Sequence, residues 1–276
     1  MKKYIIPAIL LAVAIAIIFI AFPPDDVTEQ QLPPGAVSTL PETAAPELPV
    51  KYPIAEPAQA VEPPPAAEQP ESKPALPLPG LEMADTVMRE LLTLLGGEKK
   101  FIELFQLDHF IQRFVVTVDN LPRKDIPRRQ LPVKGASGPL LVQGEKGREV
   151  ISPYNERRYA IYIELAEALD SGKLVDIYVR NYPLFQQAYS DLGYPSAYFN
   201  DRLVEVIDHL LETPELQEPI RLERPGVLYR FADPELEARS AGQKILLRIG
   251  NDNAAWLKAK LKQLREQLMT QVRRQS

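Results

Sequence analysis

The sequence predicts a mainly α-helical protein, in which a multi-helix domain with one or two small β-hairpins follows a single transmembrane helix and a disordered Pro-rich linker. Three observations support this prediction. Residues 4–22 contain no charged side chain, 16 of the 28 prolines lie between residues 23 and 79, and apolar side chains then recur at helical spacing. The expected parts are a tip and anchor (1–22), a linker (23–79) and a soluble domain (80–276).

The apolar run is the predicted transmembrane helix. The 19 residues from Tyr4 to Phe22, at a rise of about 1.5 Å each, nearly match a hydrocarbon core of roughly 30 Å. A cleaved secretory signal is the alternative, but its apolar stretch would be only about 7–15 residues long, and two prolines follow where a small-residue cleavage site is needed. Lys2 and Lys3 precede the run, which predicts a cytoplasmic N-terminus and a periplasmic domain at a bacterial inner membrane. The first expected partner is therefore the lipid bilayer, through residues 4–22.

The linker, residues 23–79, is acidic as well as rich in proline. Nine acids against two bases give it a net charge of −7, and this composition favours an extended chain. Its 57 residues span at most ~180 Å at about 3.1 Å per residue. We interpret it as a spacer, with a proline-motif ligand for another protein as the alternative.

The charge and composition of the domain exclude several classes of function. Residues 80–276 hold 28 bases and 28 acids, and this balance argues against a nucleic-acid-binding protein. Neither a P-loop nor a G-x-G-x-x-G string occurs, so we expect no nucleotide. The chain has no cysteine, which excludes thiol catalysis and cysteine-bound metals. We predict no cofactor and no metal.

Apolar periodicity and capping residues predict the elements of the domain in order. We expect helices over residues 82–95, 98–118, 155–170, 171–193, 233–249 and 252–272, a further helix between Pro195 and Pro214, and a hairpin that turns at residues 144–147. Ser171 is the expected N-cap of its helix, and Pro183 is expected to bend it. Eight tyrosines between Tyr154 and Tyr198 suggest either core packing or, alternatively, stacking on sugars.

Four acids form a ridge on the helix between Pro195 and Pro214. Asp201, Glu205, Asp208 and Glu212 fall within an arc of roughly 60°, opposite the apolar face. Converging carboxylates suit a hard cation or a catalytic pair. The alternative is a solvated helix face, because one helix alone does not enclose an ion. We name the ridge as a candidate binding site and not as a metal site.

The helix expected over residues 233–249 contains the candidate catalytic residues. Ser240 and Lys244 share a helical side at i and i+4, with Glu237 nearby, as a serine activated by lysine would require. The known spacing is S-x-x-K, and Gln243 occupies that lysine's place. We therefore expect Ser240 to be structural. The helix has two apolar faces, which predicts that it packs between two layers.

The last helix has a leucine stripe and an excess of four bases over acids through the C-terminus. We expect it to dock onto the domain with Trp256 as an anchor. Contact with an anionic membrane surface or a partner is the alternative.

Three strings carry a resemblance to a known family. VTVDNLPR, the stretch containing FNDRL, and the stretch containing FADPELEARSAGQK resemble a bacterial family of membrane-anchored proteins classified as domain of unknown function three thousand and fourteen. The resemblance covers residues 114–265, and the N-terminal anchor and proline-rich linker are similar too. Because the family has no assigned activity, the resemblance implies the extent of the domain and no catalytic residue.

Taken together, these features predict a membrane-tethered periplasmic interaction or scaffolding module of the cell envelope, with an envelope protein as its partner. The alternative is an envelope hydrolase that acts on peptidoglycan or another glycan through paired carboxylates. Two facing carboxyl groups from different helices, about 5–10 Å apart in a groove, would favour the hydrolase.

Overall fold

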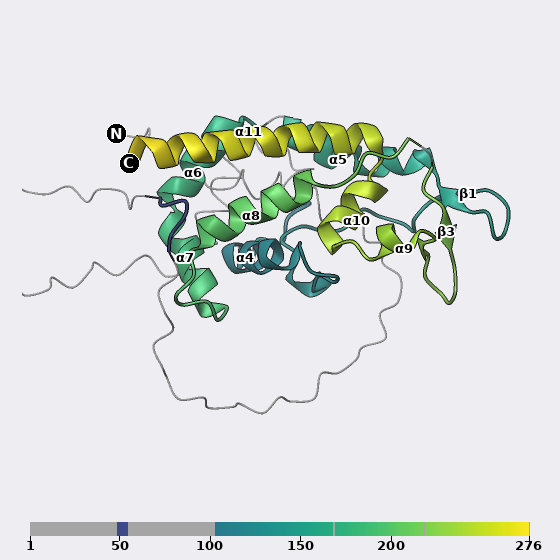
Figure 1. Cartoon of the computed structure of the whole chain (residues 1–276), viewed down its shortest axis with the longest axis horizontal. Coiled ribbons are helices and arrows are strands. Elements are labelled where there is room, and N and C mark those ends of the chain that lie inside the picture. Colours follow the sequence, from purple (N-terminus) through teal and green to yellow (C-terminus); the bar gives the residue numbers. More distant parts are fainter. Residues whose placement is uncertain (1–48, 55–102, 168, 218, 276) are drawn as a thin grey trace, which may run out of the picture.

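The computed structural model describes residues 49–54 and 103–275, except residues 168 and 218 (Figure 1). Within this part the chain is mainly helical with two small antiparallel hairpins, which confirms the predicted fold class of the domain. The predicted anchor, most of the linker and the helix expected over residues 82–95 lie outside the described residues. None of the described helices is long and apolar enough to cross a membrane.

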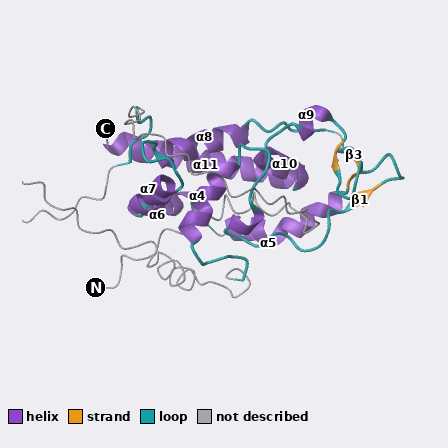
Figure 2. Cartoon of the chain, turned by 90° about the horizontal axis from the view of Figure 1, so that it is seen from below, coloured by secondary structure: helices purple, strands orange, loops and turns teal. Residues whose placement is uncertain are grey.

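Eight α-helices and two short 3-10 turns form the described domain. They are α4 (Phe110–Asn120), η2 (Arg128–Gln130), η3 (Pro153–Asn155), α5 (Glu156–Glu167), α6 (Ser171–Arg180), α7 (Tyr182–Asp191), α8 (Phe199–Leu211), α9 (Pro234–Glu237), α10 (Ala241–Arg248) and α11 (Asn251–Gln275). Helix α8 contacts both α4 and α11, while α7 packs on α4 and α6 packs on α11. Figures 1 and 2 show α11 running along one side of the domain. The centre of the core therefore lies around α8.

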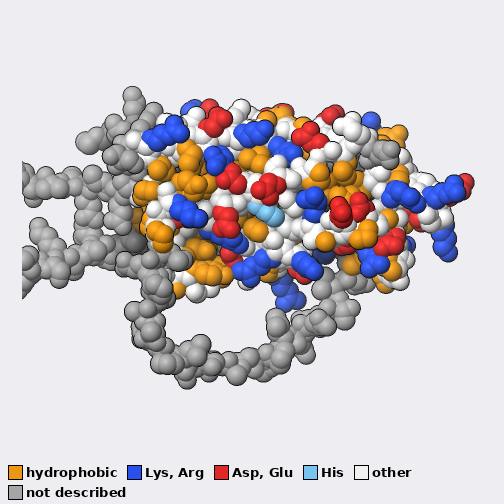
Figure 3. Space-filling model, in the orientation of Figure 1, with side chains coloured by type: hydrophobic (Ala, Val, Ile, Leu, Met, Phe, Trp, Pro, Cys, Tyr) orange, Lys and Arg blue, Asp and Glu red, His pale blue; other side chains and the backbone are white. Residues whose placement is uncertain are grey.

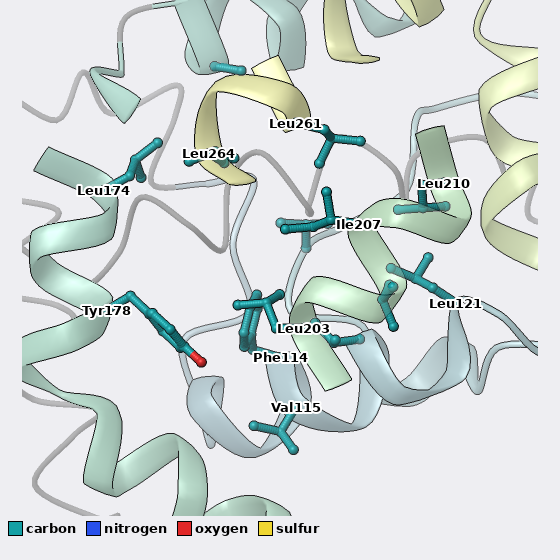
Figure 4. Close-up of a cluster of buried hydrophobic side chains, with 14 of the residues drawn as sticks. Phe114, Val115, Leu121, Leu174, Tyr178, Leu203, Ile207, Leu210, Leu261 and Leu264 are labelled. Atoms are coloured by element: carbon teal, nitrogen blue, oxygen red, sulfur yellow. The ribbon is translucent and has the colours of Figure 1, made fainter. Parts of the chain in front are cut away.

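The core is built from the apolar stripes that the sequence predicts. Leu257, Leu261, Leu264 and Leu268 of α11 are each at most 1% exposed. Figure 4 shows Leu261 and Leu264 facing Ile207 of α8, with side chains of α4 and α6 closing the cluster. Truncating one such leucine to alanine costs about 2–5 kcal/mol, so this stripe fixes α11 on the domain.

The helix expected over residues 98–118 is wrong over residues 103–109, because α4 begins only at Phe110, while residues 98–102 lie outside the described residues. Before it, Phe105 forms a β-bridge with Val133, and the Lys134 N–H donates to the Leu104 carbonyl at 2.8 Å. His109 then adopts a left-handed φ of 52°, which separates this extended segment from the helix. Pairing with a distant segment has replaced the helical hydrogen bonds that periodicity alone predicts.

The helix expected over residues 171–193 is two helices, α6 and α7. Pro183 lacks an N–H and stands in the first turn of α7, so the bend predicted there is a complete break. The N-cap of α6 is Asp170, whose Oδ1 accepts the Lys173 N–H at 2.9 Å, and not Ser171 as predicted. Ser171 is the first residue of the helix, and its hydroxyl donates to Gln263 Oε1 of α11 at 3.2 Å.

The stretch 233–249 also divides into two helices. Asp233 caps α9 and Gly250, at a φ of 93°, follows α10, as predicted, but the chain restarts at Ser240 instead of running through. Its two apolar faces are confirmed in part: Leu246, expected beside Leu236 and Leu247, lies in the main core, and Ala238, expected on the other face, is exposed. Leu236 and Leu247 belong to a small second cluster of buried residues, while Ala241, Ile245, Leu246 and Ile249 belong to the main core.

Two hairpins lie at one end of the molecule. Strands β1 (Val142–Gln143) and β2 (Val150–Ile151) turn at residues 144–147 as predicted, and β3 (Leu222–Glu223) pairs with β4 (Arg230–Phe231). The hairpins are joined, since the Ile151 N–H donates to the Ile220 carbonyl at 2.9 Å. Figures 1 and 2 place them at the end opposite α6 and α7.

Candidate functional site

The three candidate catalytic residues are near one another in sequence but have different partners. Ser240 Oγ lies 2.8 Å from Nε2 of His209 on α8 and accepts the Gln243 N–H at 3.2 Å as the N-cap of α10. Lys244 Nζ instead lies 3.2 Å from Glu237 Oε1. The geometry therefore makes a serine–histidine contact, which the sequence did not predict, in place of a serine–lysine pair.

A serine–histidine contact suggests acyl transfer, but the groups that would stabilise an oxyanion are already occupied. Backbone amides at a helix N-terminus serve this purpose when they point at the reacting centre. Here the Ala241 N–H donates to the Arg123 carbonyl at 2.7 Å, and the Gly242 N–H donates to the Leu121 carbonyl at 3.0 Å. The third amide, that of Gln243, bonds to Ser240 itself. Ser240 is buried, and its contact with His209 holds α10 against α8, while the amides of Ala241 and Gly242 hold α10 against the residues that end and follow α4.

The acidic ridge does not converge on one point. Glu205 and Asp208 each pair with an arginine: Glu205 Oε2 lies 3.1 Å from Arg202 Nη1, and Asp208 Oδ2 lies 3.0 Å from Arg265 Nη2 on α11. Glu212 is exposed at the end of α8. In the part of the chain that the structure describes, no group of three or more acids and histidines could hold a metal ion. The ridge side chains therefore serve as separate contacts.

Asp201, the first acid of the ridge, receives a segment of the predicted linker. Its two carboxylate oxygens accept the Lys51 N–H at 2.8 Å and the Tyr52 N–H at 2.7 Å. Residues 49–54 thus lie against the domain, beside α7 in Figure 1, where they are drawn in dark blue. This part of the predicted linker is not a free spacer, because its backbone is bonded to α8.

Tyr198, which bonds to Ile54 of this segment, belongs to a group of packed aromatic side chains. Tyr182 packs on both Tyr178 and Tyr198, with ring centroids 5.6 and 5.1 Å apart. Burial raises the pKa of both Tyr178 and Tyr182, so these phenols stay neutral. The Tyr182 hydroxyl donates to Gln186 Oε1 at 2.7 Å, whereas the Tyr178 hydroxyl has no hydrogen-bond partner among the described residues. Of the eight tyrosines considered for sugar stacking, five are buried in the core: Tyr159, Tyr162, Tyr178, Tyr182 and Tyr189. These five favour the interpretation as core packing.

Two of the strings that carry the family resemblance meet in a buried ion-pair network. Asp119 at the end of α4 is 3% exposed, and its Oδ1 lies 3.0 Å from Arg202 Nε on α8. Arg202 Nη2 also donates to the Asp119 carbonyl at 2.9 Å, and Arg123 pairs with the other carboxylate oxygen. Arg123 Nη2 also donates to the Tyr194 hydroxyl at 2.9 Å. The network joins α4 to α8.

Trp256 and three bases of α11, Lys258, Lys260 and Arg265, make contacts within the domain. Trp256 is partly buried and packs against the main core, in agreement with its predicted place as an anchor. Lys258 donates to the Thr213 carbonyl at 2.7 Å, and Lys260 donates to the Leu169 carbonyl. Helix α11 is therefore docked on the domain, as its leucine stripe predicts.

The two hairpins expose apolar and basic side chains together. Four large apolar residues there are at least 39% exposed: Leu141, Tyr154, Val227 and Leu228. Residues 141–158 and 220–231 also hold six exposed bases and only two exposed acids; the bases are Lys146, Arg148, Arg157, Arg221, Arg224 and Arg230. We call the surface made by these ten residues the hairpin end. Basic and apolar side chains project at this end in Figure 3.

Two of the five guanidinium groups at the hairpin end lie over aromatic rings, and that of Arg230 pairs with Glu223 at 2.6 Å. The Arg157 guanidinium lies 5.2 Å from the ring centroid of Tyr154, and that of Arg224 lies 5.3 Å from the centroid of Tyr229. Such contacts order a long side chain while leaving its charge available to an anion. The hairpin end is thus an ordered surface of apolar and cationic character.

Comparison with known proteins matches residues 110–265 to a family model described as "Protein of unknown function (DUF3014)". The match confirms the family expected from the strings quoted above. Searches of curated proteins and of solved structures give no match.

Proposed function

We propose that this chain, which belongs to the DUF3014 family, is a membrane-tethered interaction module of the bacterial cell envelope. An anchor over residues 4–22 holds it in the inner membrane, and its periplasmic domain binds an envelope protein. The observation that carries the proposal is the hairpin end, where four exposed apolar residues lie among six exposed bases. An apolar patch of this kind on a soluble domain marks an interaction surface.

The position of the hairpin end suits a tethered module. The linker meets the domain at residues 49–54, beside α7, and the hairpins lie at the opposite end (Figures 1 and 2). A domain held from one end therefore presents the other end to whatever lies across the compartment. The chemistry of the surface defines the partner: an acidic protein surface with apolar side chains at its centre.

The alternative of an envelope hydrolase has less support. Its candidate residues already make internal contacts: Ser240 caps α10, and Asp208 pairs with Arg265. Asp201 bonds to two backbone amides of the docked segment. None of these observations favours a second candidate function.

The proposal is tested by crosslinking in living cells. A photoreactive amino acid replaces Leu228 in the full chain, and a matched copy carries it at Leu192, which is 38% exposed near the opposite end. We expect a discrete protein adduct from position 228 only, and its loss when Lys146→Glu reverses one charge of the surface. Equal adducts at both positions, or adducts with lipid or glycan alone, would refute the proposal.

A further inference from the structure

The contact between residues 49–54 and α8 has the features of a peptide-binding site. Five hydrogen bonds join the two, and each involves a backbone group of the segment. Asp201 accepts two successive amides, Asn200 Nδ2 donates to the Tyr52 carbonyl at 2.8 Å, and the Tyr198 hydroxyl lies 2.6 and 3.1 Å from the Ile54 nitrogen and oxygen. A site that contacts backbone binds an extended chain, as a sheet edge does.

One side chain of the segment anchors it in the core. Ile54 is 6% exposed and belongs to the main cluster of buried residues, while Tyr52 is partly buried against the same cluster. Val50, Lys51 and Pro53 remain exposed. Backbone bonds therefore supply the general affinity for an extended peptide, and burial of one aliphatic side chain in the core supplies the selection.

One hydrogen-bond acceptor of the site is left without a partner in the described part of the chain when the segment is docked. Asn200 is 0% exposed, and its Oδ1 has no hydrogen-bond partner among the described residues. Only six residues of the segment are described against the domain, and four of them are exposed. A short segment held by a few hydrogen bonds and one aliphatic anchor is in the range of local opening that is accessible without unfolding the domain.

We propose that Tyr198, Asn200 and Asp201 form a binding site for an extended peptide with an aliphatic anchor, and that residues 50–54 of this chain are its resident, exchangeable ligand. Docking then sets the length of the tether. With residues 49–54 held on α8, only the 26 residues 23–48 connect the domain to the proposed anchor, which limits the span to ~80 Å instead of ~180 Å. The statement about the tether rests on the proposed function, whereas the binding site does not.

The test measures the docked segment directly in the full chain, in lipid nanodiscs. The chain has no cysteine, so Val50→Cys and Glu212→Cys place two spin labels at exposed positions without competing sites. We expect one narrow distance distribution by electron double resonance. Tyr198→Phe removes the hydroxyl that bonds to Ile54 and keeps the ring, and we expect it to broaden the distribution. Tyr194→Phe is the matched control, because that hydroxyl bonds to Arg123 instead.

Competition tests whether the site takes a peptide. An excess of a synthetic peptide of residues 47–57 is expected to broaden the distance distribution of the doubly labelled chain, whereas a scrambled peptide is not. A distribution that stays narrow in Tyr198→Phe and with the peptide would overturn the proposal. A distance that disappears on dilution with unlabelled chain would overturn it as well, since the ligand would then come from a second copy. Neither result depends on the partner of the hairpin end, so failure here is distinct from failure of the proposed function.

Discussion

Arg202 contacts two carboxylates of unequal burial, which gives a matched test of what holds α4 against α8. The Asp119 side chain is 5% exposed and Arg202 is 19% exposed, whereas Glu205 is 67% exposed. Asp119→Asn and Glu205→Gln each remove one negative charge and keep the shape of the side chain. Asp119→Asn weakens the pairs with both Arg202 and Arg123, whereas Glu205→Gln weakens only the exposed pair with Arg202, so the two variants compare the buried network with one exposed pair.

The expected magnitudes differ clearly. Removing one partner of a buried ion pair costs about 3–5 kcal/mol, and since asparagine retains an acceptor oxygen we expect the lower end, about 3 kcal/mol, for Asp119→Asn. An exposed pair contributes about 0–1 kcal/mol, so we expect less than about 1 kcal/mol for Glu205→Gln. The loss is smaller for Glu205→Gln because Arg202 keeps its hydrogen bonds to the carboxylate and the backbone carbonyl of Asp119 in that variant.

Urea unfolding of the full chain measures both variants, with the single tryptophan, Trp256, as the fluorescent probe. The midpoints are compared at equal m-value, so that a shift reports stability and not a change in the exposed surface. Equal losses in the two variants would refute the reasoning, and so would a loss below about 1 kcal/mol for Asp119→Asn.

Three further predictions use the same unfolding assay. Ser240→Ala is expected to lower the free energy of unfolding by about 1–2 kcal/mol through loss of the N-cap, with the fold retained by circular dichroism; no change would contradict its structural role. Gly242→Ala is expected to destabilise by about 1–3 kcal/mol although alanine favours helix, because its Cβ would lie 2.6 Å from Leu210 Cδ2; a gain in stability would show that α10 and α8 shift freely. Burial raises the pKa of Tyr189 from 10.0 to about 12, so this tyrosine ionises at lower pH in the unfolded chain than in the folded one. The free energy of unfolding is therefore unaffected by this group below pH 10 and falls as the pH rises from 10 toward 12, by about 1.4 kcal/mol per pH unit. Tyr189→Phe is expected to reduce that slope, and an unchanged slope would contradict the assignment.

Local patterns predict much of the fold. The leucine stripe of α11, the cap at Asp233 and the glycines of the first hairpin each depend on residues within a few positions of one another, and each is confirmed. The division of the stretch 233–249 depends on distant partners. The amides of Ala241 and Gly242 bond to carbonyls about 120 residues earlier in the chain. A local signal was nevertheless available, since Ser240 and Gln243 have the capping-box spacing that begins a new helix.

The candidate sites show the same limit. The ridge on α8 was predicted correctly as one helical face, but the use of Asp201 depends on a contact 150 residues away. The composition of the linker predicts an extended chain and does not predict that residues 49–54 dock on α8. One signal was available: between residues 23 and 79, Tyr52 is the only aromatic residue and Ile54 the only isoleucine. The hairpin end had a similar signal, since Val227 and Leu228 directly follow a Pro-Gly turn.

The central claim is that the hairpin end is covered by a partner in the envelope. Because the chain has no cysteine, Leu228→Cys and Leu192→Cys each provide one site for a membrane-impermeant maleimide. Labelling rates are measured for the full chain in spheroplasts and after purification. We predict that both sites react from the periplasmic side, and that position 228 reacts several-fold more slowly in spheroplasts than in the purified protein while position 192 does not. Equal rates at position 228 in both preparations, or reaction of either site only after the membrane is lysed, would contradict the account.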